Sequence, residues 1–480
     1  MIFKESMSKL LMSIVLIFSI SVTSSLAQTR LTLDKAISIA LQNNAQTAVS
    51  KLEVQKATAA VKEAYGYAMP TVGLNAQYYY YLEKMKMPFP DFNAMLNNSV
   101  YGVLFKEGVL PEDPEKYLPM ASSLQSFSLS NNYSASIEVS QVLFNSAVFR
   151  GIGASQIYLD ASKVQLRSNV ATTVLDVKKA FFGVLLVQNL LEIMEASLEN
   201  AQTNYQNVEA LLKQGLVSEF DAMQVEVQVE NLKPQVESIK NQLENAKNGL
   251  KVILNIDQNE EVEIDGSLVY DKMEGVSQQE FIGKAMKQNL DILSMEYKVM
   301  VDEAFIDLDR SEFWPSVAAF GNYQFNGAAD DLNFQNYQQS MVGISLQMNL
   351  FNGFQTTNRK QQAEIVMYQS QEQLDQIKDF TASQVKAKIL DLQRVEKMLD
   401  AQEKNVGLAQ KAYDISLRRY QEGEGTQLEI KNSDIELRTA KTNRLQSVYD
   451  YIVAKSELEK LLGEVNEKYY EEIELLNDNN

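Results

Sequence analysis

Val72-Gly73-Leu74-Asn75-Ala76-Gln77-Tyr78-Tyr79-Tyr80 alternates between apolar and polar side chains and ends in three tyrosines. The even positions are apolar or aromatic, whereas Gly73, Asn75 and Gln77 point the opposite way in an extended chain. This period of two predicts a β-strand with one apolar face. The alternation recurs along the chain, and we expect four strands, at about 71–81, 133–144, 316–325 and 340–351.

These segments are typical of strands that cross an outer membrane, because such strands have about ten residues, an apolar outer face and aromatic side chains near their ends. A soluble β-sandwich is the alternative, since its inward faces show the same alternation. Four strands cannot close a barrel, however, and lipid does not tolerate the open edges of a sheet. The strands must therefore be shared between subunits. Three copies give twelve strands, an even number within the range of known barrels.

The first 27 residues predict a secretory signal peptide. Lys4 and Lys9 precede an apolar run from Leu10 to Ile20, and Ser25-Leu26-Ala27 offers a cleavage site. A short anchor helix is the alternative, but the run is too short to span a bilayer comfortably. No run of about 18 apolar residues follows, so any membrane crossing by the rest of the chain requires strands.

The composition argues against several classes of function. The formal net charge is −19, and it becomes −20 when Lys4, Lys9 and Glu5 are removed with residues 1–27. Such acidity argues against nucleic acid binding, which relies on Lys and Arg. The chain has no cysteine and no histidine, so it lacks disulfides, the usual zinc and copper ligands, and the base of a nucleophilic triad. We therefore expect no cofactor, no metal site and no enzymatic activity.

The chain carries a tandem repeat. Residues 36–44 match residues 281–289 at an offset of 245, and Leu143-Phe144-Asn145 matches Leu350-Phe351-Asn352 at an offset of 207. Each half predicts a helix, a strand, a loop, a strand and two long helices joined by a turn. After the signal peptide, the expected segments are a first repeat at 28–254, an equatorial connector at 255–277, a second repeat at 278–463 and an acidic tail at 464–480.

The long helices are expected at 147–213, 218–254, 354–422 and 427–463, after a shorter one at 33–68. At 1.5 Å per residue, a helix over 147–213 would reach roughly 100 Å. From Val225 to Ile253 the apolar residues alternate steps of four and three, which predicts a coiled-coil seam. Pro234 should kink or locally loosen that helix. Short turns make the paired helices antiparallel. On the helices alone, a solvent-exposed structural coiled coil is an equal alternative.

The turns between the long helices, at 213–221 and 421–429, share a glycine, then a hydroxyl residue, then an acid. The glycine suits the positive φ that ends a helix, the hydroxyl suits the N-cap of the next helix, and the acid suits a capping box. These residues are Gly215, Ser218 and Asp221 in the first turn and Gly423, Thr426 and Glu429 in the second. The pattern therefore has a complete local structural explanation, beside any functional one.

Essentially the whole chain after the expected signal peptide resembles the TolC-like outer-membrane efflux proteins. The resemblance rests on the duplicated plan, on Ala40-Leu41-Gln42-Asn43-Asn44, on Leu350-Phe351-Asn352-Gly353 and on the two turns. It implies a homotrimeric α+β membrane protein, in which a 12-stranded antiparallel β-barrel in the outer membrane continues into a long α-helical coiled-coil barrel in the periplasm. It also implies a periplasmic adaptor (membrane fusion) protein and an inner-membrane pump of the RND or ABC type as partners.

The resemblance also implies roles for the two turns, which in the family close the tunnel and meet the adaptor. Glu429 matches one position of a ring of acidic residues, and Asn432 occupies the second acidic position. Tyr420 and Asp221 match positions that latch neighbouring helices. The arginine that some relatives use there is replaced by Gly425, so we expect no salt-bridged lock of that kind. The residues that correspond to the adaptor-docking tips are Gly215, Leu216, Val217, Ser218, Gly423, Gly425 and Thr426.

The sequence thus favours a passive export duct across the outer membrane and periplasm. The alternative is a periplasmic coiled-coil adaptor without a pore. The loop at 82–132 is much longer than its counterpart at 326–338, and we place it at the external mouth, where a surface-receptor role is a further alternative. Met85, Met87 and Met95 lie in this loop without regular spacing, which favours packing over soft-metal binding.

Overall fold

The computed structural model describes residues 29–273, 275, 277–464 and 469–470. The expected signal peptide, and the expected tail apart from residues 464, 469 and 470, lie outside this part of the chain. The described residues are mostly helical and form two compact units. One unit contains Ala59–Gln156 and Glu303–Glu364 and holds the long strands, and the other contains the remaining residues, most of them in helices.

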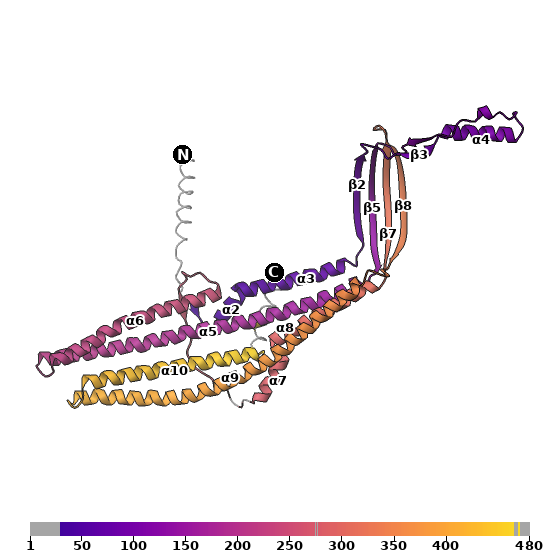
Figure 1. The fold of residues 1–480 in the computed structure, drawn as a ribbon. Coiled ribbons are helices and arrows are strands. Elements are labelled where there is room, and N and C mark those ends of the chain that lie inside the picture. The colour runs from indigo at the N-terminus through magenta and orange to yellow at the C-terminus, as the bar shows by residue number, and fades with distance from the viewer. Residues whose placement is uncertain (1–28, 274, 276, 465–468, 471–480) are drawn as a thin grey trace, which may run out of the picture. The chain divides into compact units, whose positions relative to one another are not determined.

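The strand unit contains a four-stranded antiparallel sheet in the order β2-β5-β7-β8 (Figure 1). Its strands span Thr71–Tyr80, Asn131–Phe144, Ser316–Ala329 and Gln335–Gln347. In register, Leu74 of β2 pairs with Ile137 of β5, which pairs with Tyr323 of β7. The apolar side chains lie on one open face, where Leu74 is 77% and Ile344 of β8 is 72% exposed. β2 and β8 are the two edges of this sheet.

The last strand, β8, lies several residues earlier than the alternation suggested. β7 continues through Ala329, so its partner begins at Gln335 after a short turn. At the other end, Gly353 and Phe354 adopt positive φ values of 66° and 63° and turn the chain into the next helix. The alternation around 348–351 therefore continues past the last residue that pairs with β7.

Residues 82–130, most of the segment described from the sequence as a loop, contain secondary structure of their own. They contain strand β3 (Met87–Pro90), helix α4 (Phe92–Lys106), a 3₁₀ turn η1 (Pro114–Lys116) and strand β4 (Ser122–Gln125). β3 and β4 pair with each other in an antiparallel hairpin. We call residues 82–130 the external insert. Asp91 caps α4, because its carboxylate accepts hydrogen bonds from the two amides at Asn93 and Ala94.

The single helix expected at 33–68 is divided at Asn44 into α2 (Leu33–Asn43) and α3 (Ala45–Gly66). Asn44 has an extended ψ of 128°, its side-chain oxygen accepts bonds from two amides at the start of α3, and its Nδ2 donates to Ile253 O at 3.1 Å. The same arrangement recurs 245 residues later at Asn289, between α7 (Gln278–Gln288) and α8 (Leu290–Arg310), where Nδ2 donates to Leu461 O at 3.0 Å. α8 is followed by η2 (Ser311–Phe313).

Two antiparallel hairpins of long helices dominate the second unit (Figure 1). The first joins α5 (Ser146–Lys213) to α6 (Glu219–Leu254), and the second joins α9 (Gln355–Gln421) to α10 (Gln427–Leu461). α6 includes Pro234 and is assigned as one helix, and Leu232 and Val236 on either side of the proline are buried. Two short strands, β1 (Thr29–Leu31) and β6 (Val262–Ile264), pair in parallel beside the apolar core of the first hairpin.

None of the helices among the described residues has an apolar stretch long enough for a membrane span.

Candidate functional site

The two hairpin tips end their first helices in the same way. Gly215 and Gly423 have positive φ values of 76° and 78°, as expected. At the first tip the amide of Leu216 donates to Leu211 O at 3.0 Å, and at the second the amide of Glu424 donates to Arg419 O at 2.9 Å. These bonds satisfy carbonyls that the end of a helix leaves free. Glycine is needed at both positions because side chains disfavour this conformation.

The two tips start their second helices differently. In the first, Ser218 Oγ accepts a bond from the Asp221 amide at 3.1 Å, and the Asp221 carboxylate accepts from Ser218, which completes a capping box. In the second, Thr426 Oγ1 accepts from the Glu429 amide at 3.3 Å, but the Glu429 carboxylate turns elsewhere. It accepts a bond from Arg419 Nη1 at 3.2 Å. Only the first tip therefore uses its acid to cap its own helix.

Arg419 is the residue of this site that the sequence analysis missed. Its Nη2 also donates to Glu424 O at 3.0 Å, so one guanidinium joins the end of α9, the turn and the start of α10. The signal for it is a base and an acid, Arg419 and Glu429, on opposite sides of a glycine turn. The pair lies within one tip, so it differs from a lock between neighbouring helix pairs.

The turn around Arg419 is tight because Gly425 has no side chain. A Cβ at Gly425 would lie 2.9 Å from the Tyr420 amide nitrogen and 3.2 Å from the Arg419 carbonyl carbon. An arginine at position 425 would therefore require the backbone of the tip to shift. Asn432 is exposed on α10, three residues after Glu429, so the two positions of the expected acidic ring lie close together along one helix.

Tyr420 connects the two hairpins through its ring. It belongs to α9, yet it packs in an apolar cluster whose other members come from the first hairpin. Those members are Tyr205, Val208, Leu212, Val217, Ala222 and Val225. The Tyr420 hydroxyl is buried and has no hydrogen-bond partner among the described residues. Asp221 is bonded to Ser218 instead, so the structure does not join Tyr420 and Asp221 by a hydrogen bond.

Polar pairs also join α5 of the first hairpin to α10 of the second, close to the tips. Asn204 Nδ2 donates to Gln427 Oε1 at 2.8 Å, and Ser197 Oγ donates to Asp434 Oδ2 at 3.0 Å. Asp434 is only 5% exposed, and Arg438 Nε also donates to it at 3.0 Å. A buried carboxylate is tolerated because these two donors replace water.

Further from the tips, the same two helices are joined by ion pairs. Lys178 Nζ lies 2.8 Å from Glu459 Oε2, and Lys179 Nζ lies 2.6 Å from Glu457 Oε1. Lys388 of α9 reaches Glu457 as well, at 2.5 Å. Burial opposes ionisation of Glu457, but hydrogen bonds and charge from the two lysines outweigh it and lower the pKa of this carboxyl.

The interior of each hairpin and the contact between hairpins thus differ in chemistry. Within the first hairpin, α5 and α6 share apolar clusters such as Ala201, Val229 and Leu232. Between the hairpins, the contacts include several polar pairs and the Tyr420 ring. The lysine–glutamate ion pairs are partly exposed and contribute little net free energy each. The Ser197–Asp434 pair is buried, so the loss of either partner would be costly. The contact between the hairpins is therefore held mainly by its buried polar groups and the Tyr420 ring.

A groove of about 780 Å³ brings the two tips together. Leu216 and Val217 of the first tip line it with Tyr420, Gly423 and Gly425 of the second. Five of the residues expected from the family resemblance therefore lie around one groove, whereas Asp221 and Glu429 are not among the residues that line it. Among the described residues, no three acidic side chains converge in a way that could hold a metal ion.

Comparison with known proteins agrees with this architecture. Residues 36–255 and 281–464 match the family model described as outer membrane efflux protein. Outer membrane protein TolC of Vibrio cholerae is 23% identical over 339 residues, which cover 70% of this chain and 77% of TolC. Alkaline protease secretion protein AprF of Pseudomonas aeruginosa is 20% identical over 342 residues, which cover 70% and 71% of the two chains.

A solved structure shows the same fold. The CmeC outer membrane channel of Campylobacter jejuni aligns with a TM-score of 0.69 at 15% identity, over 91% of this chain and 86% of CmeC. The resemblance noted from the sequence is thereby confirmed. Because the family model matches most of the sequence, in one segment from each half, the chain belongs to the outer membrane efflux protein family.

Proposed function

We propose that three copies of this chain pool their strands into one 12-stranded antiparallel β-barrel, which opens into a periplasmic tunnel lined by the long helices. The family consists of outer-membrane channels of efflux and secretion systems, so this chain acts in the outer membrane as a passive export duct. A periplasmic adaptor protein would connect the duct to an inner-membrane pump of the RND or ABC type, and the pump would supply the energy for export. The chain itself therefore needs no catalytic site.

The observation that carries this proposal is the sheet β2-β5-β7-β8, whose apolar face and two edges are open. In lipid, each unpaired backbone amide or carbonyl of an edge strand costs several kcal/mol. β2 and β8 run in opposite directions because the sheet has four antiparallel strands. The β8 edge of one copy can therefore pair with the β2 edge of the next and keep the whole wall antiparallel.

The division of the chain into two repeats, 28–254 and 278–463, with a connector at 255–277, forms part of this proposal. Its support is the recurrence of the same capping arrangement at Asn44 and Asn289. Two similar repeats in each of three copies would place six helical hairpins around the tunnel. Quasi-equivalent hairpins make a closed ring with pseudo-sixfold packing, which suits a tube.

The proposed gate is formed by Glu429, Asp221, Tyr420 and Asn432 at the hairpin tips, and the adaptor would dock on the tip residues around the groove. Three copies of Glu429 would form an acidic ring at the constriction, as the family resemblance implies. In this chain each Glu429 already has Arg419 as a counter-charge. The ring is therefore close to neutral, and its attraction for cations is weak compared with a bare carboxylate ring.

Detergent extraction followed by planar-bilayer recording tests the function. The protein should leave the membrane fraction only with detergent and should then form ion-conducting pores. A periplasmic adaptor, the alternative reading, would be released without detergent and would leave the bilayer resistance unchanged.

A further inference from the structure

The external insert folds around one face of α4. Asn98 Nδ2 donates to Leu118 O at 2.8 Å and its Oδ1 accepts from the Leu118 amide at 2.7 Å, while Asn97 Nδ2 donates to Lys116 O at 2.7 Å. The rings of Phe105 and Tyr117 meet edge to face at 5.8 Å. These contacts fix segment 114–120 against one side of the helix.

The opposite side of α4 carries an apolar stripe that remains about half exposed. The stripe residues follow steps of four, four and three and are 47–60% exposed; they are Phe92, Leu96, Val100 and Val103. Such steps place the side chains on one face of a helix, over about 16 Å. This is the spacing of a helix that packs against another chain element rather than against water.

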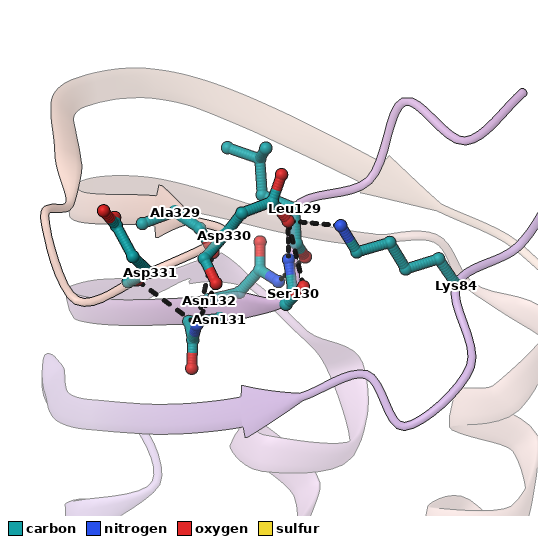
Figure 2. A network of polar contacts seen from close by, with 8 residues as sticks. All are labelled: Lys84, Leu129, Ser130, Asn131, Asn132, Ala329, Asp330 and Asp331. Carbon is teal, nitrogen blue, oxygen red and sulfur yellow. Dashed lines mark hydrogen bonds and ion pairs between the residues drawn. The ribbon is translucent and has the colours of Figure 1, made fainter.

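The base of the external insert is bonded to the turn between β7 and β8 (Figure 2). The chain leaves edge strand β2 at Tyr80, and Lys84 then pairs with Asp330 in the turn between β7 and β8. Asp330 Oδ1 also accepts from the Ser130 amide at 3.0 Å and from Ser130 Oγ at 2.9 Å. Asn131 Nδ2 donates to Asp331 O at 3.2 Å. The external insert is therefore fixed at the β7–β8 turn, at the end of the sheet that carries β8, and the proposed barrel places the next copy beside β8.

We propose that the α4 stripe packs against the external insert of the neighbouring copy in the trimer, so that the three inserts form one collar around the outer mouth. This inference rests on the trimer of the proposed function. A second copy fits because the base of the insert is fixed at the edge that the next subunit must occupy. The collar thus extends the strand–strand interface beyond the membrane.

The size and charge of the stripe favour a second copy over other occupants. A stable partner complex needs about 800 Å² from each side, more than four side chains on one helix supply, but a small stripe suffices as an extension of an existing interface. Helices that lie on lipid surfaces are rich in Lys and Arg on their polar face. α4 has one charged residue, Lys106, in fifteen.

Photo-crosslinking in the intact trimer tests the proposal. A photoreactive phenylalanine analogue is placed at Val100, and after illumination the products are separated by size and the crosslinked peptides are mapped by mass spectrometry. We expect an adduct of two copies of the chain, with the attachment within residues 82–130. The matched control is Val109, which is 64% exposed but lies beyond α4 and off the stripe, and which should give no such adduct.

Native mass spectrometry of the same sample separates the two hypotheses. A trimer whose Val100 probe attaches only to lipid, to another protein or to its own chain would overturn the collar and leave the duct intact. A monomer would overturn both. Should the Val100 variant fail to assemble, Val103 on the same stripe takes the probe, with the same outcomes. The double change Leu96→Ser and Val103→Ser should abolish the Val100 adduct while the trimer persists.

Discussion

Replacing Tyr420 by phenylalanine separates two ways in which this residue can hold the hairpin tips together. A hydroxyl latch would lose its hydrogen bond in Tyr420→Phe. In this structure the Tyr420 ring packs against the first hairpin, and its hydroxyl is buried with no partner among the described residues. Because the hydroxyl is already enclosed within one chain, Asp221 of a neighbouring copy has no access to it.

Tyr420→Phe and Tyr420→Ala should change the stability of the packed tips in opposite directions. A buried hydroxyl without a hydrogen bond costs about 1–3 kcal/mol, so its removal in Tyr420→Phe should stabilise the packed arrangement by up to that amount. Tyr420→Ala removes the ring as well. Truncation of a fully buried aromatic residue costs about 3–5 kcal/mol, and roughly half of that applies to the half-buried Tyr420. The alanine variant should thus shift the balance toward separated tips by about 2 kcal/mol.

Single-channel recording in planar bilayers measures this balance as the fraction of time spent in the high-conductance state. We expect Tyr420→Phe to conduct no more often than the parent protein, and Tyr420→Ala to occupy the high-conductance state more often by a factor of about 10 to 30. If Tyr420→Phe opened the channel as much as Tyr420→Ala, the hydroxyl and not the ring would be the latch, and the packing argument would be wrong.

Three further changes test other contacts. Arg419→Ala exposes the Glu429 carboxylate and should make the conductance more sensitive to divalent cations than Arg418→Ala does; both leave stability within about 1 kcal/mol, because an exposed pair contributes little. Equal cation sensitivity in the two variants would remove Arg419 from the site. Asp434→Ala removes a carboxylate between two donors and should lower the free energy of unfolding by about 3 kcal/mol, measured by denaturant titration, whereas a loss below 1 kcal/mol would contradict its burial. The hydrogen bond from Lys84 and the bonds from Ser130 lower the pKa of Asp330 to about 2. A carboxyl whose pKa is lowered by folding stabilises the fold at pH values above its pKa in the unfolded chain. That stabilisation is lost as the pH falls through the pKa in the folded chain. Pepsin should therefore cut the external insert faster at pH 2 than at pH 4. The ratio of the two rates should be smaller for Asp330→Asn, which also controls for the pH dependence of pepsin itself.

The repeated elements of the fold could be predicted from the sequence because their hydrophobic patterns are periodic. The alternation in 72–80 and the seam from Val225 to Ile253 report directly on which face of each element is apolar. The glycine turns could also be predicted, because the positive φ at Gly215 and Gly423 follows from local chemistry.

Elements that depend on contacts far along the chain were not predicted. The apolar residues of α4 do follow helical steps, but the helix lies between proline-rich stretches, and its contact from Asn98 to Leu118 spans 20 residues. The break at Asn44 depends on a bond to Ile253, more than 200 residues away. The sequence does place a base and an acid, Arg419 and Glu429, on opposite sides of a glycine turn, but their contact also depends on the tight backbone around Gly425, which the local pattern does not show.

Disulfide formation between the two sheet edges is the most direct test of the shared barrel. The chain has no native cysteine, so one cysteine on β2 can be combined with single cysteines placed along β8. Within one chain these edges are separated by three strand spacings, about 14 Å, which is too far for a disulfide. We expect at least one pairing to give covalently linked chains that end at three copies. The absence of linkage in every pairing, or a ladder that continues past three, would contradict the trimeric barrel.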